Sequence, residues 1–103
     1  MPGGAANVAC NLAQLGAQVT LIGPCGDDTI ASDLKAELCQ FPTIKFMPVP
    51  IAGRRTSLKT RYRASGQQIL RVDDENIDTI DAGAQQILCE TVSSVIANSD
   101  MLV

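Results

Sequence analysis

The first quarter of the chain changes from a helical spacing of apolar residues to the compact apolar run of a strand. Apolar residues recur at i, i+4 and i+7 over residues 7–15, which predicts a helix that ends at Gly16. The stripe consists of Val8, Leu12 and Leu15. Residues 17–23 are short, apolar and rich in β-branched side chains, which predicts a buried strand. A helix, a glycine and a buried strand in this order are typical of an α/β sheet.

A second helix and a second strand follow the turn-rich loop at residues 23–28. Asp28 or Thr29 can cap a helix that runs to about Cys39, because both side chains accept hydrogen bonds from first-turn amides. Its apolar face consists of Ile30, Leu34 and Leu38. Residues 44–49 have the composition of a strand, but the prolines inside and after it confine it to an edge or make it a linker.

Residues 56–64 show the alternation of a strand with two different faces. One face consists of Ser57, Lys59, Arg61 and Arg63. The other consists of Thr56, Leu58, Thr60, Tyr62 and Ala64. This pattern predicts a half-buried strand with one polar face. Ser65 and Gly66 form a turn before a second strand at residues 68–73, so the sequence predicts a β-hairpin.

The remaining residues predict one more helix and the start of one more strand. Residues 73–76 are expected to form a solvated acidic loop, and Asp81 caps a helix over residues 82–97. Residues 101–103 read as the first residues of a buried strand. Because a domain seldom stops on an unpaired apolar strand end, we expect both termini to be cut from a longer domain.

Composition and charge narrow the class of protein. Apolar residues make up 46% of the chain and aromatic residues only 3%, so aliphatic side chains must fill the core. The net charge of −3 argues against a nucleic-acid partner. No segment reaches the roughly 18 consecutive apolar residues that a membrane span needs, so we expect no membrane partner. Arg54, Arg55 and Arg63 are expected to be plain surface charges, and Arg71 and Asp73 an ion pair.

The chain contains no histidine, and its four cysteines are widely spaced. Without histidine, Ser–His and Cys–His nucleophiles and mixed Cys/His zinc sites are excluded within these residues. All-cysteine zinc sites normally arrive as close pairs, which are absent here. We therefore expect no metal site and reduced thiols, as in a cytoplasmic protein. The cysteines are Cys10, Cys25, Cys39 and Cys89.

The most specific chemistry lies at residues 2–9, where two glycines precede the first predicted helix. Gly3 and Gly4 let backbone approach a ligand closely, and Asn7 offers amide donors and an acceptor. The helix behind them presents free N–H groups to whatever lies in front. A plain turn at the glycines and a helix cap at Asn7 are the alternatives. A dinucleotide site is disfavoured because the third spaced glycine is absent.

These residues closely resemble the amino-terminal signature of the ribokinase-like (PfkB) family of sugar kinases. The matching segments are residues 2–9, 15–17, 21–23 and 26–28. Within that family, residues 56–61 and 67–75 resemble the heptose 7-phosphate kinase branch, which is a less specific match. The resemblance covers essentially the whole chain.

The resemblance implies an α/β fold, as part of a ribokinase-like, Rossmann-type three-layer sandwich with a small β-hairpin lid over the sugar. Family members transfer the γ-phosphoryl group of ATP to a sugar hydroxyl, so ATP and Mg²⁺ are implied for the full-length enzyme. The resemblance places Gly3, Gly4 and Asn7 at the sugar. It places Lys59 and Arg61 near the sugar or its phosphate, which needs cationic partners. A solvated strand face is the alternative for these two cations.

Large parts of the family pattern are missing from these residues. The first strand, with an acidic sugar-binding residue, is expected before Met1. The Gly-Ala-Gly-Asp-type catalytic motif and the ATP site are expected far downstream. Asp27 and Asp28 are expected to cap a helix and not to bind magnesium. We therefore predict that residues 1–103 are a partial sugar-kinase domain, with no catalytic or metal-binding residue, that binds no cofactor by itself and is inactive alone.

The resemblance favours a heptose 7-phosphate substrate, in the synthesis of ADP-heptose for lipopolysaccharide. Two alternatives stay open. One is another ribokinase-like kinase, acting on ribose, fructose or a nucleoside. The other is a non-catalytic sugar-binding module. Because lid-mediated dimers occur in the family, a homodimer through the strands of residues 56–73 is also consistent with the resemblance.

Overall fold

The computed structural model describes residues 1–103, which form three helices and four strands. In chain order these are α1 (Gly4–Gln14), β1 (Val19–Cys25), α2 (Thr29–Leu38), β2 (Ile44–Pro50), β3 (Leu58–Ala64), β4 (Gln67–Asp74) and α3 (Ala82–Ile96). The strands make two separate sheets, with β1 and β2 parallel and β3 and β4 antiparallel. The predicted α/β class is therefore confirmed.

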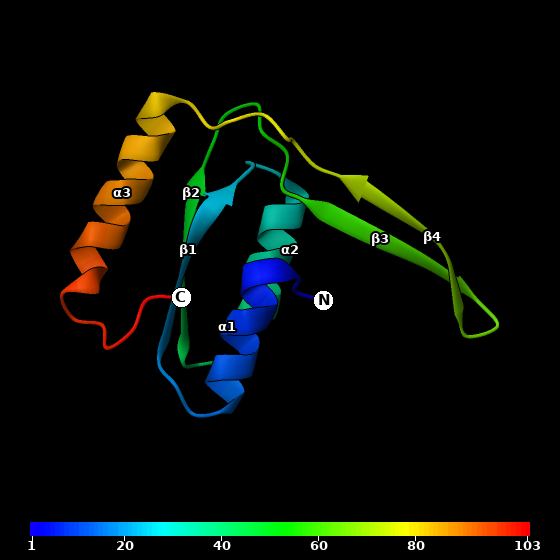
Figure 1. The fold of residues 1–103 in the computed structure, drawn as a ribbon, viewed down its shortest axis with the longest axis horizontal. Helices are drawn as coiled ribbons and strands as arrows, with labels where there is room; N and C mark the ends of the chain where they lie inside the picture. Colours follow the sequence, from blue (N-terminus) through cyan, green and yellow to red (C-terminus); the bar gives the residue numbers. More distant parts are fainter.

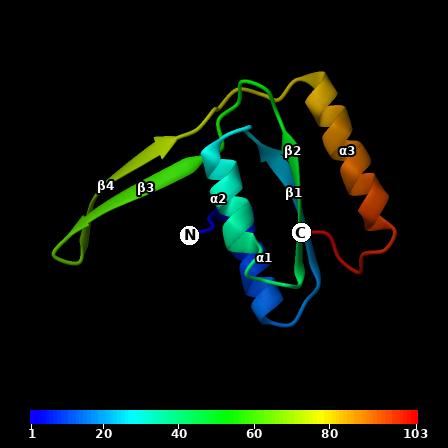
Figure 2. The ribbon, with the colours of Figure 1, turned by 180° about the vertical axis from the view of Figure 1, so that it is seen from behind.

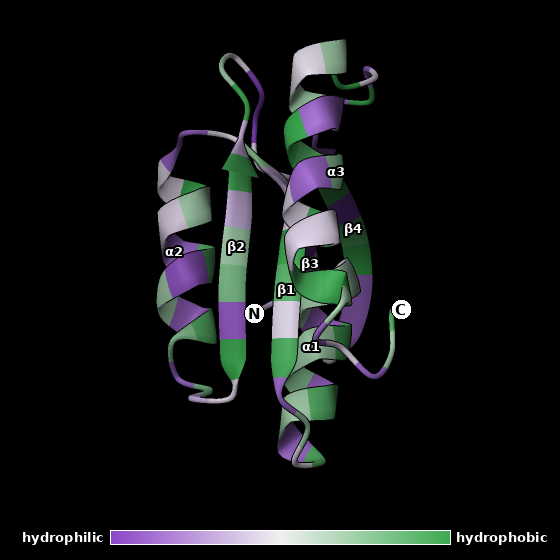
Figure 3. Ribbon diagram, turned by 90° about the vertical axis from the view of Figure 1, so that its left-hand side faces the viewer, coloured by the Kyte–Doolittle hydropathy of each residue, from purple (hydrophilic) through white to green (hydrophobic).

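The parallel sheet is the middle of three layers. Helices α1 and α2 lie on one of its faces and α3 lies on the other (Figures 1 and 2). Seen from the side of α3, the two strands are mostly apolar along their length (Figure 3). Leu38, with 1% of its surface exposed, packs with Ala6 and Cys10 in the core between the sheet and the first two helices. Helices on both faces of the sheet agree with the apolar composition of the strands, of which Cys25 and Val49 are buried.

Helix α1 begins three residues earlier than the apolar spacing predicted. Gly3 is the residue before its first turn, and Gly4 has a left-handed φ of +52°. Gly16, with φ +91°, follows the last turn and ends the helix as predicted. The predicted apolar stripe is wrong at Val8 and Leu15, which are 43% and 84% exposed, because small residues of the helix face the sheet instead. Those buried residues are Ala6, Ala9 and Cys10.

Helix α2 and strand β2 follow the prediction closely. Asp28 caps α2 by accepting a hydrogen bond of 2.8 Å from the Ala31 amide. Strand β2 pairs with β1 in parallel register from Val19↔Ile44 onward. Its prolines are tolerated because β2 has β1 on one side only, so their missing N–H groups can face the open edge.

The hairpin of β3 and β4 projects away from the three layers (Figure 1). Ser65 and Gly66 both have positive φ, at 50° and 79°, which is the geometry of a two-residue hairpin turn. Every residue of β4 is exposed, and so are all residues of β3 except Thr60. The predicted half-burial of this strand is therefore wrong, because no other element of the chain covers the apolar face of the hairpin.

Helix α3 and the last residues complete the chain. Asp81 caps α3, as predicted, with a hydrogen bond of 2.9 Å from the Ala84 amide. Residues 101–103 do not form the predicted strand, because no backbone hydrogen bond pairs them with another strand. None of the three helices combines the length and the apolar character that a membrane span requires.

Candidate functional site

The glycines that precede α1 form an open backbone surface. Gly3 is extended, with φ −124° and ψ 171°, and no side chain caps the helix. A Cβ atom added at Gly3 or Gly4 would meet nothing within 4 Å. Asn7, one turn into the helix, is exposed, so it does not act as the helix cap. The two glycines and Asn7 therefore lie together on an uncapped first turn that a ligand can reach, with positive partial charge at its end.

Lys59 lies on β3 between two carboxylates. Its Nζ atom is 3.0 Å from Asp73 Oδ2 and 3.2 Å from Glu75 Oε2. Its hydrogen bond to Asp73 and, as the next largest cause, its hydrogen bond to Glu75 raise the pKa of Lys59 above its ordinary value. The bond to Lys59 in turn lowers the pKa of Asp73. The charge of Lys59 is thus already compensated within the hairpin.

Arg61 is in a different situation on the same face of the hairpin. It lies directly opposite Arg71 in the register of the two strands. Arg71 forms the predicted ion pair with Asp73, at 3.0 Å, whereas Arg61 has no carboxylate within ion-pair distance. Like charges directly opposite one another across an antiparallel pair are destabilising. Arg61 is therefore a cation whose charge the hairpin does not balance.

The predicted site residues form two groups, and the members of each group lie near one another, but no bond connects the two groups. Gly3, Gly4 and Asn7 share the first turn of α1, and Lys59 and Arg61 share one face of β3. No hydrogen bond or ion pair connects the first group to the second. The two groups thus lie on a helix and on a projecting hairpin.

A set of contacts at the base of the hairpin was missed by the sequence analysis. Asp28 Oδ2 accepts a hydrogen bond of 2.8 Å from the Thr56 amide, in addition to the cap made by Oδ1. The bonds from Thr56 and Ala31 lower the pKa of Asp28. The Gly26 amide donates to Thr56 Oγ1 at 2.9 Å. The turn residues at positions 23–28 could have indicated that another segment packs closely on this loop. The sequence gives no sign that this segment is at Thr56, about thirty positions along the chain.

Two of the expected surface arginines are also part of this region. The Arg54 guanidinium donates to the carbonyls of Asn76 and Asp78, each at 3.1 Å, so the expectation of a plain surface charge is wrong for it. Arg55 pairs with Asp74 at 3.1 Å, and its amide donates to Asn76 Oδ1. The acidic residues predicted to form a solvated loop are exposed, as expected, but Asp73 and Asp74 belong to β4, and Lys59 and Arg55 contact the segment.

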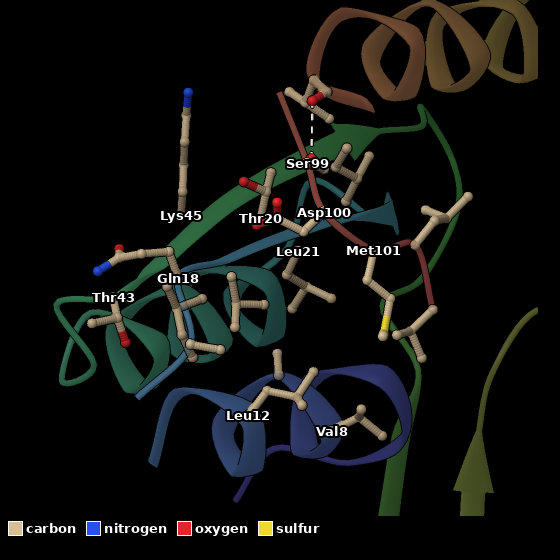
Figure 4. A pocket seen from close by; sticks show the side chains of 18 of the residues that line it. Val8, Leu12, Gln18, Thr20, Leu21, Thr43, Lys45, Ser99, Asp100 and Met101 are labelled. Atoms are coloured by element: carbon tan, nitrogen blue, oxygen red, sulfur yellow. Dashed lines mark hydrogen bonds between the residues drawn. The ribbon is translucent and has the colours of Figure 1, made fainter. Parts of the chain in front are cut away.

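A separate, mostly apolar groove has a volume of about 920 Å³. It runs beside β1, between α1 and α3, and 15 of its 23 lining residues are hydrophobic. Val8 and Leu12 face Leu21 and Met101 across it (Figure 4). None of the predicted sugar-binding residues lines it. The predicted sugar-binding residues and this mostly apolar groove are therefore separate features of the molecule.

No group of three or more histidine, cysteine, aspartate or glutamate side chains is placed to hold a metal ion. Asp28, the acidic residue best placed in the loop, uses both carboxylate oxygens for backbone amides. The residues present therefore do not fit a magnesium site. The four cysteines are unpaired, with Cys10 and Cys25 buried and the other two exposed.

Comparison with known proteins decides between the families that share such a layered fold. Residues 1–103, the whole chain, match the profile of the pfkB family carbohydrate kinases. This chain belongs to the pfkB carbohydrate kinase family. The uncapped glycine turn and the hairpin are thus parts of a carbohydrate kinase fold.

Individual relatives in this kinase family match over nearly all of the chain. The chain is 44% identical to the Bifunctional protein HldE of Hyphomonas neptunium over 90% of its length, and 44% identical to that of Gluconobacter oxydans over its whole length. It is 38% identical to the Bifunctional protein HldE of Helicobacter acinonychis over 98% of its length. The matched region spans 19–22% of the length of these relatives.

Proposed function

We propose that the full-length protein is an ATP-dependent kinase that phosphorylates a heptose 7-phosphate in the cytoplasm, on the route to ADP-heptose for lipopolysaccharide. Residues 1–103 contribute part of its sugar site. The observation that carries the proposal is the uncapped glycine turn beside Asn7 in a chain of the carbohydrate kinase family. The likeness to proteins named HldE supports the choice of substrate.

Gly3, Gly4 and Asn7 are proposed to hold the sugar ring. Gly4 needs to be glycine for its positive φ, whereas the open surroundings of Gly3 give no internal reason for a missing side chain. A ligand that approaches the backbone supplies such a reason. The Asn7 amide can donate to one hydroxyl and accept from its neighbour, which suits the paired hydroxyls of a sugar.

Arg61 is proposed as the main cation for the phosphate of the substrate, with Lys59 beside it. A phosphate placed near Arg61 and the opposing Arg71 would relieve their repulsion and accept charge-assisted hydrogen bonds. Lys59 is less available because Asp73 and Glu75 already surround its ammonium group.

ATP and Mg²⁺ are proposed as cofactors of the full-length enzyme and not of these residues alone. ATP would supply the transferable phosphoryl group, and Mg²⁺ would neutralise charge as that group moves. No residue set here fits the metal. No catalytic role is assigned to any residue of this chain, because the family resemblance places the catalytic motif downstream. We accordingly expect the isolated 103-residue chain to lack kinase activity.

The apolar groove and the apolar face of the hairpin are two further proposed contacts. The groove borders the unpaired edge of β1, so we propose that it receives the strand that the family resemblance places before Met1. The hairpin exposes large apolar side chains on the face opposite Arg61, which we propose as a homodimer contact. These residues are Leu58, Tyr62, Leu70 and Val72.

The experiment that tests the function measures ADP release by the full-length protein with a panel of sugars. We expect turnover with heptose 7-phosphate to exceed that with ribose, fructose or a nucleoside. The 103-residue chain should give no turnover above background. Preference for a sugar without a phosphate would contradict the assigned substrate, and no turnover with any sugar would favour a non-catalytic module.

A further inference from the structure

The direction of the hairpin depends on its two connecting segments. Nearly all residues of β3 and β4 are exposed, so packing on the helices does not hold the hairpin in place. One segment, residues 51–57, leads from β2 into β3, and the other, residues 75–81, leads from β4 to α3. Whatever fixes these segments therefore fixes where the cationic face of Arg61 points.

Asp28 ties the first of these segments to helix α2. Oδ1 accepts from the Ala31 amide in the first turn of α2, and Oδ2 accepts from the Thr56 amide, both at 2.8 Å. The Thr56 hydroxyl is held in turn by the Gly26 amide at 2.9 Å. One carboxylate thus joins a helix of the three-layer core to the chain that enters the hairpin.

The space around this contact is filled tightly. Gly26 is buried, and a Cβ atom there would collide with the Arg54 carbonyl and lie 2.6 Å from Asp28 Oδ2. It would also lie 3.0 Å from the Thr56 nitrogen. The close approach of these two loops consequently requires glycine at this position and leaves little freedom for the entering segment.

Arg54 and Arg55 tie the entering segment to the leaving one. The Arg54 guanidinium donates to two carbonyls of the segment after β4, and the Arg55 amide donates to the Asn76 side chain at 2.9 Å. With the Asp28–Thr56 contact, these bonds fix both connections of the hairpin at one point. We call this set of contacts the clasp; it consists of Gly26, Asp28, Arg54, Arg55, Thr56 and Asn76.

We propose that Asp28 is a positioning residue, whose carboxylate aims the hairpin by joining the start of α2 to Thr56. A helix cap alone needs one acceptor oxygen, which serine or asparagine also supplies. Only an ionised carboxylate presents an acceptor to Ala31 on one side and to Thr56 on the other. The hydrogen bond from Thr56 thus explains why residue 28 is an aspartate and not a serine or an asparagine. The proposal rests on the proposed function in one respect, namely that the hairpin carries contacts to the sugar phosphate.

Asp28→Asn in the full-length enzyme separates the two contacts. Asparagine keeps an acceptor for the Ala31 amide but turns an NH₂ group toward the Thr56 amide, so two donors face each other. By hydrogen exchange, we expect Thr56 and the hairpin to lose roughly tenfold protection, while the first turn of α2 stays protected. The KM for heptose 7-phosphate should rise about two- to tenfold, the loss of one hydrogen bond, with kcat and the KM for ATP changed less.

Asp27→Asn is the matched control, since Asp27 is exposed and its carboxylate makes no hydrogen bond; it should leave exchange and KM unchanged. Thr56→Val and Thr56→Ser form a second pair that does not touch the helix cap. Valine removes the acceptor for the Gly26 amide and serine keeps it, so serine should restore the wild-type KM. This pair tests whether holding residue 56 aims the hairpin; Asp28→Ser, which keeps one acceptor for the Ala31 amide and removes the second oxygen, decides the part of Asp28 if Asp28→Asn fails to fold.

Two results would overturn the proposal. Wild-type protection of Thr56 in Asp28→Asn would show that the carboxylate does not hold the segment. Lost protection with an unchanged KM for the sugar would show that it holds the segment without aiming the hairpin at the substrate. If the wild-type enzyme phosphorylates none of the sugars tested, the proposed function fails, whereas the exchange measurement still decides whether Asp28 holds the hairpin.

Discussion

At the scale of single residues, the two glycines before α1 have different reasons to be glycine. Gly4 has φ +52°, which a side chain tolerates poorly, whereas Gly3 is extended in open space. Gly4→Ala should therefore cost about 1 kcal/mol of stability. Gly3→Ala should leave the free energy of unfolding unchanged but raise the KM for the sugar. Urea denaturation and steady-state kinetics check this, and an unchanged KM in Gly3→Ala would remove the glycine from the sugar site.

The two cations of β3 should differ in their importance for the phosphate. Arg61→Gln should raise the KM for heptose 7-phosphate by about tenfold to a hundredfold, since a hydrogen bond to a charged group contributes roughly 1.5–3 kcal/mol. Lys59→Gln should have a smaller effect because Asp73 and Glu75 already compensate that charge. Neither variant should change the KM for ATP. If Lys59→Gln raised the KM for heptose 7-phosphate more than Arg61→Gln, Lys59 and not Arg61 would be the main cation for the phosphate.

Asp28 should also govern part of the acid sensitivity of the fold. The Thr56 and Ala31 amides lower its pKa, so the unfolded chain binds the proton more readily than the folded chain. Its contribution is present above the ordinary aspartate pKa, near 3.9, and is lost as the pH falls through the lowered folded pKa. Urea denaturation between pH 2 and 6 should show a shallower loss of stability in Asp28→Asn than in the wild type. Equal slopes in the wild type and in Asp28→Asn would contradict the prediction.

At the scale of elements, the contact of α1 and α2 with the sheet depends on one large side chain. Leu38 is 1% exposed and packs on Ala6 and Cys10. Leu38→Ala should lower the free energy of unfolding by about 2–5 kcal/mol, through lost burial and the cavity left behind. Leu15→Ala is the matched control, because Leu15 is 84% exposed and should change stability by less than about 0.5 kcal/mol. Similar losses in both variants would place the core elsewhere.

The sequence was sufficient to predict each helix and strand of the structure, because spacing, caps and turns are local. Asp28 and Asp81 cap helices, and Ser65 and Gly66 turn the hairpin, as predicted. The sequence-based predictions were wrong where contacts between distant segments determine the environment of a residue. The exposure of Leu15 depends on which side of α1 meets the sheet. Arg54 donates hydrogen bonds to the segment that follows β4, and no local sequence pattern shows that this segment passes beside it.

The candidate site was predictable only in part for the same reason. The glycine motif is contiguous, so its open first turn could be anticipated from residues 2–9. Periodicity placed Lys59 and Arg61 on one face, but not the carboxylates opposite Lys59 or the arginine opposite Arg61, which depend on strand register. The contact between Asp28 and Thr56 joins residues 28 positions apart and has no sequence signature.

At the scale of the whole molecule, the hairpin separates charge from apolar surface. Its polar face carries Arg61, whereas Tyr62 and Leu70 are more than half exposed on the other face. Tyr62→Lys should weaken the proposed dimer at least about tenfold, because burying a large apolar side chain contributes roughly 1.5–3 kcal/mol. Sedimentation of the full-length protein measures this, with the exposed Ile77→Lys as control. A monomeric wild-type protein, or a dimer that tolerates Tyr62→Lys, would contradict the proposal.

The clasp also has a consequence for the order in which the protein assembles. The closest partners of β3 and β4 are three positions apart, from Ala64 to Gln67, whereas Val19 and Ile44 of the parallel sheet are 25 apart. Hairpins form within roughly 1–10 μs, long before pairings that must close longer loops. An isolated two-stranded hairpin is only marginally stable in water, however. The hairpin should therefore form early and reopen repeatedly, and become permanent only when folding of α2 delivers the carboxylate of Asp28 to Thr56.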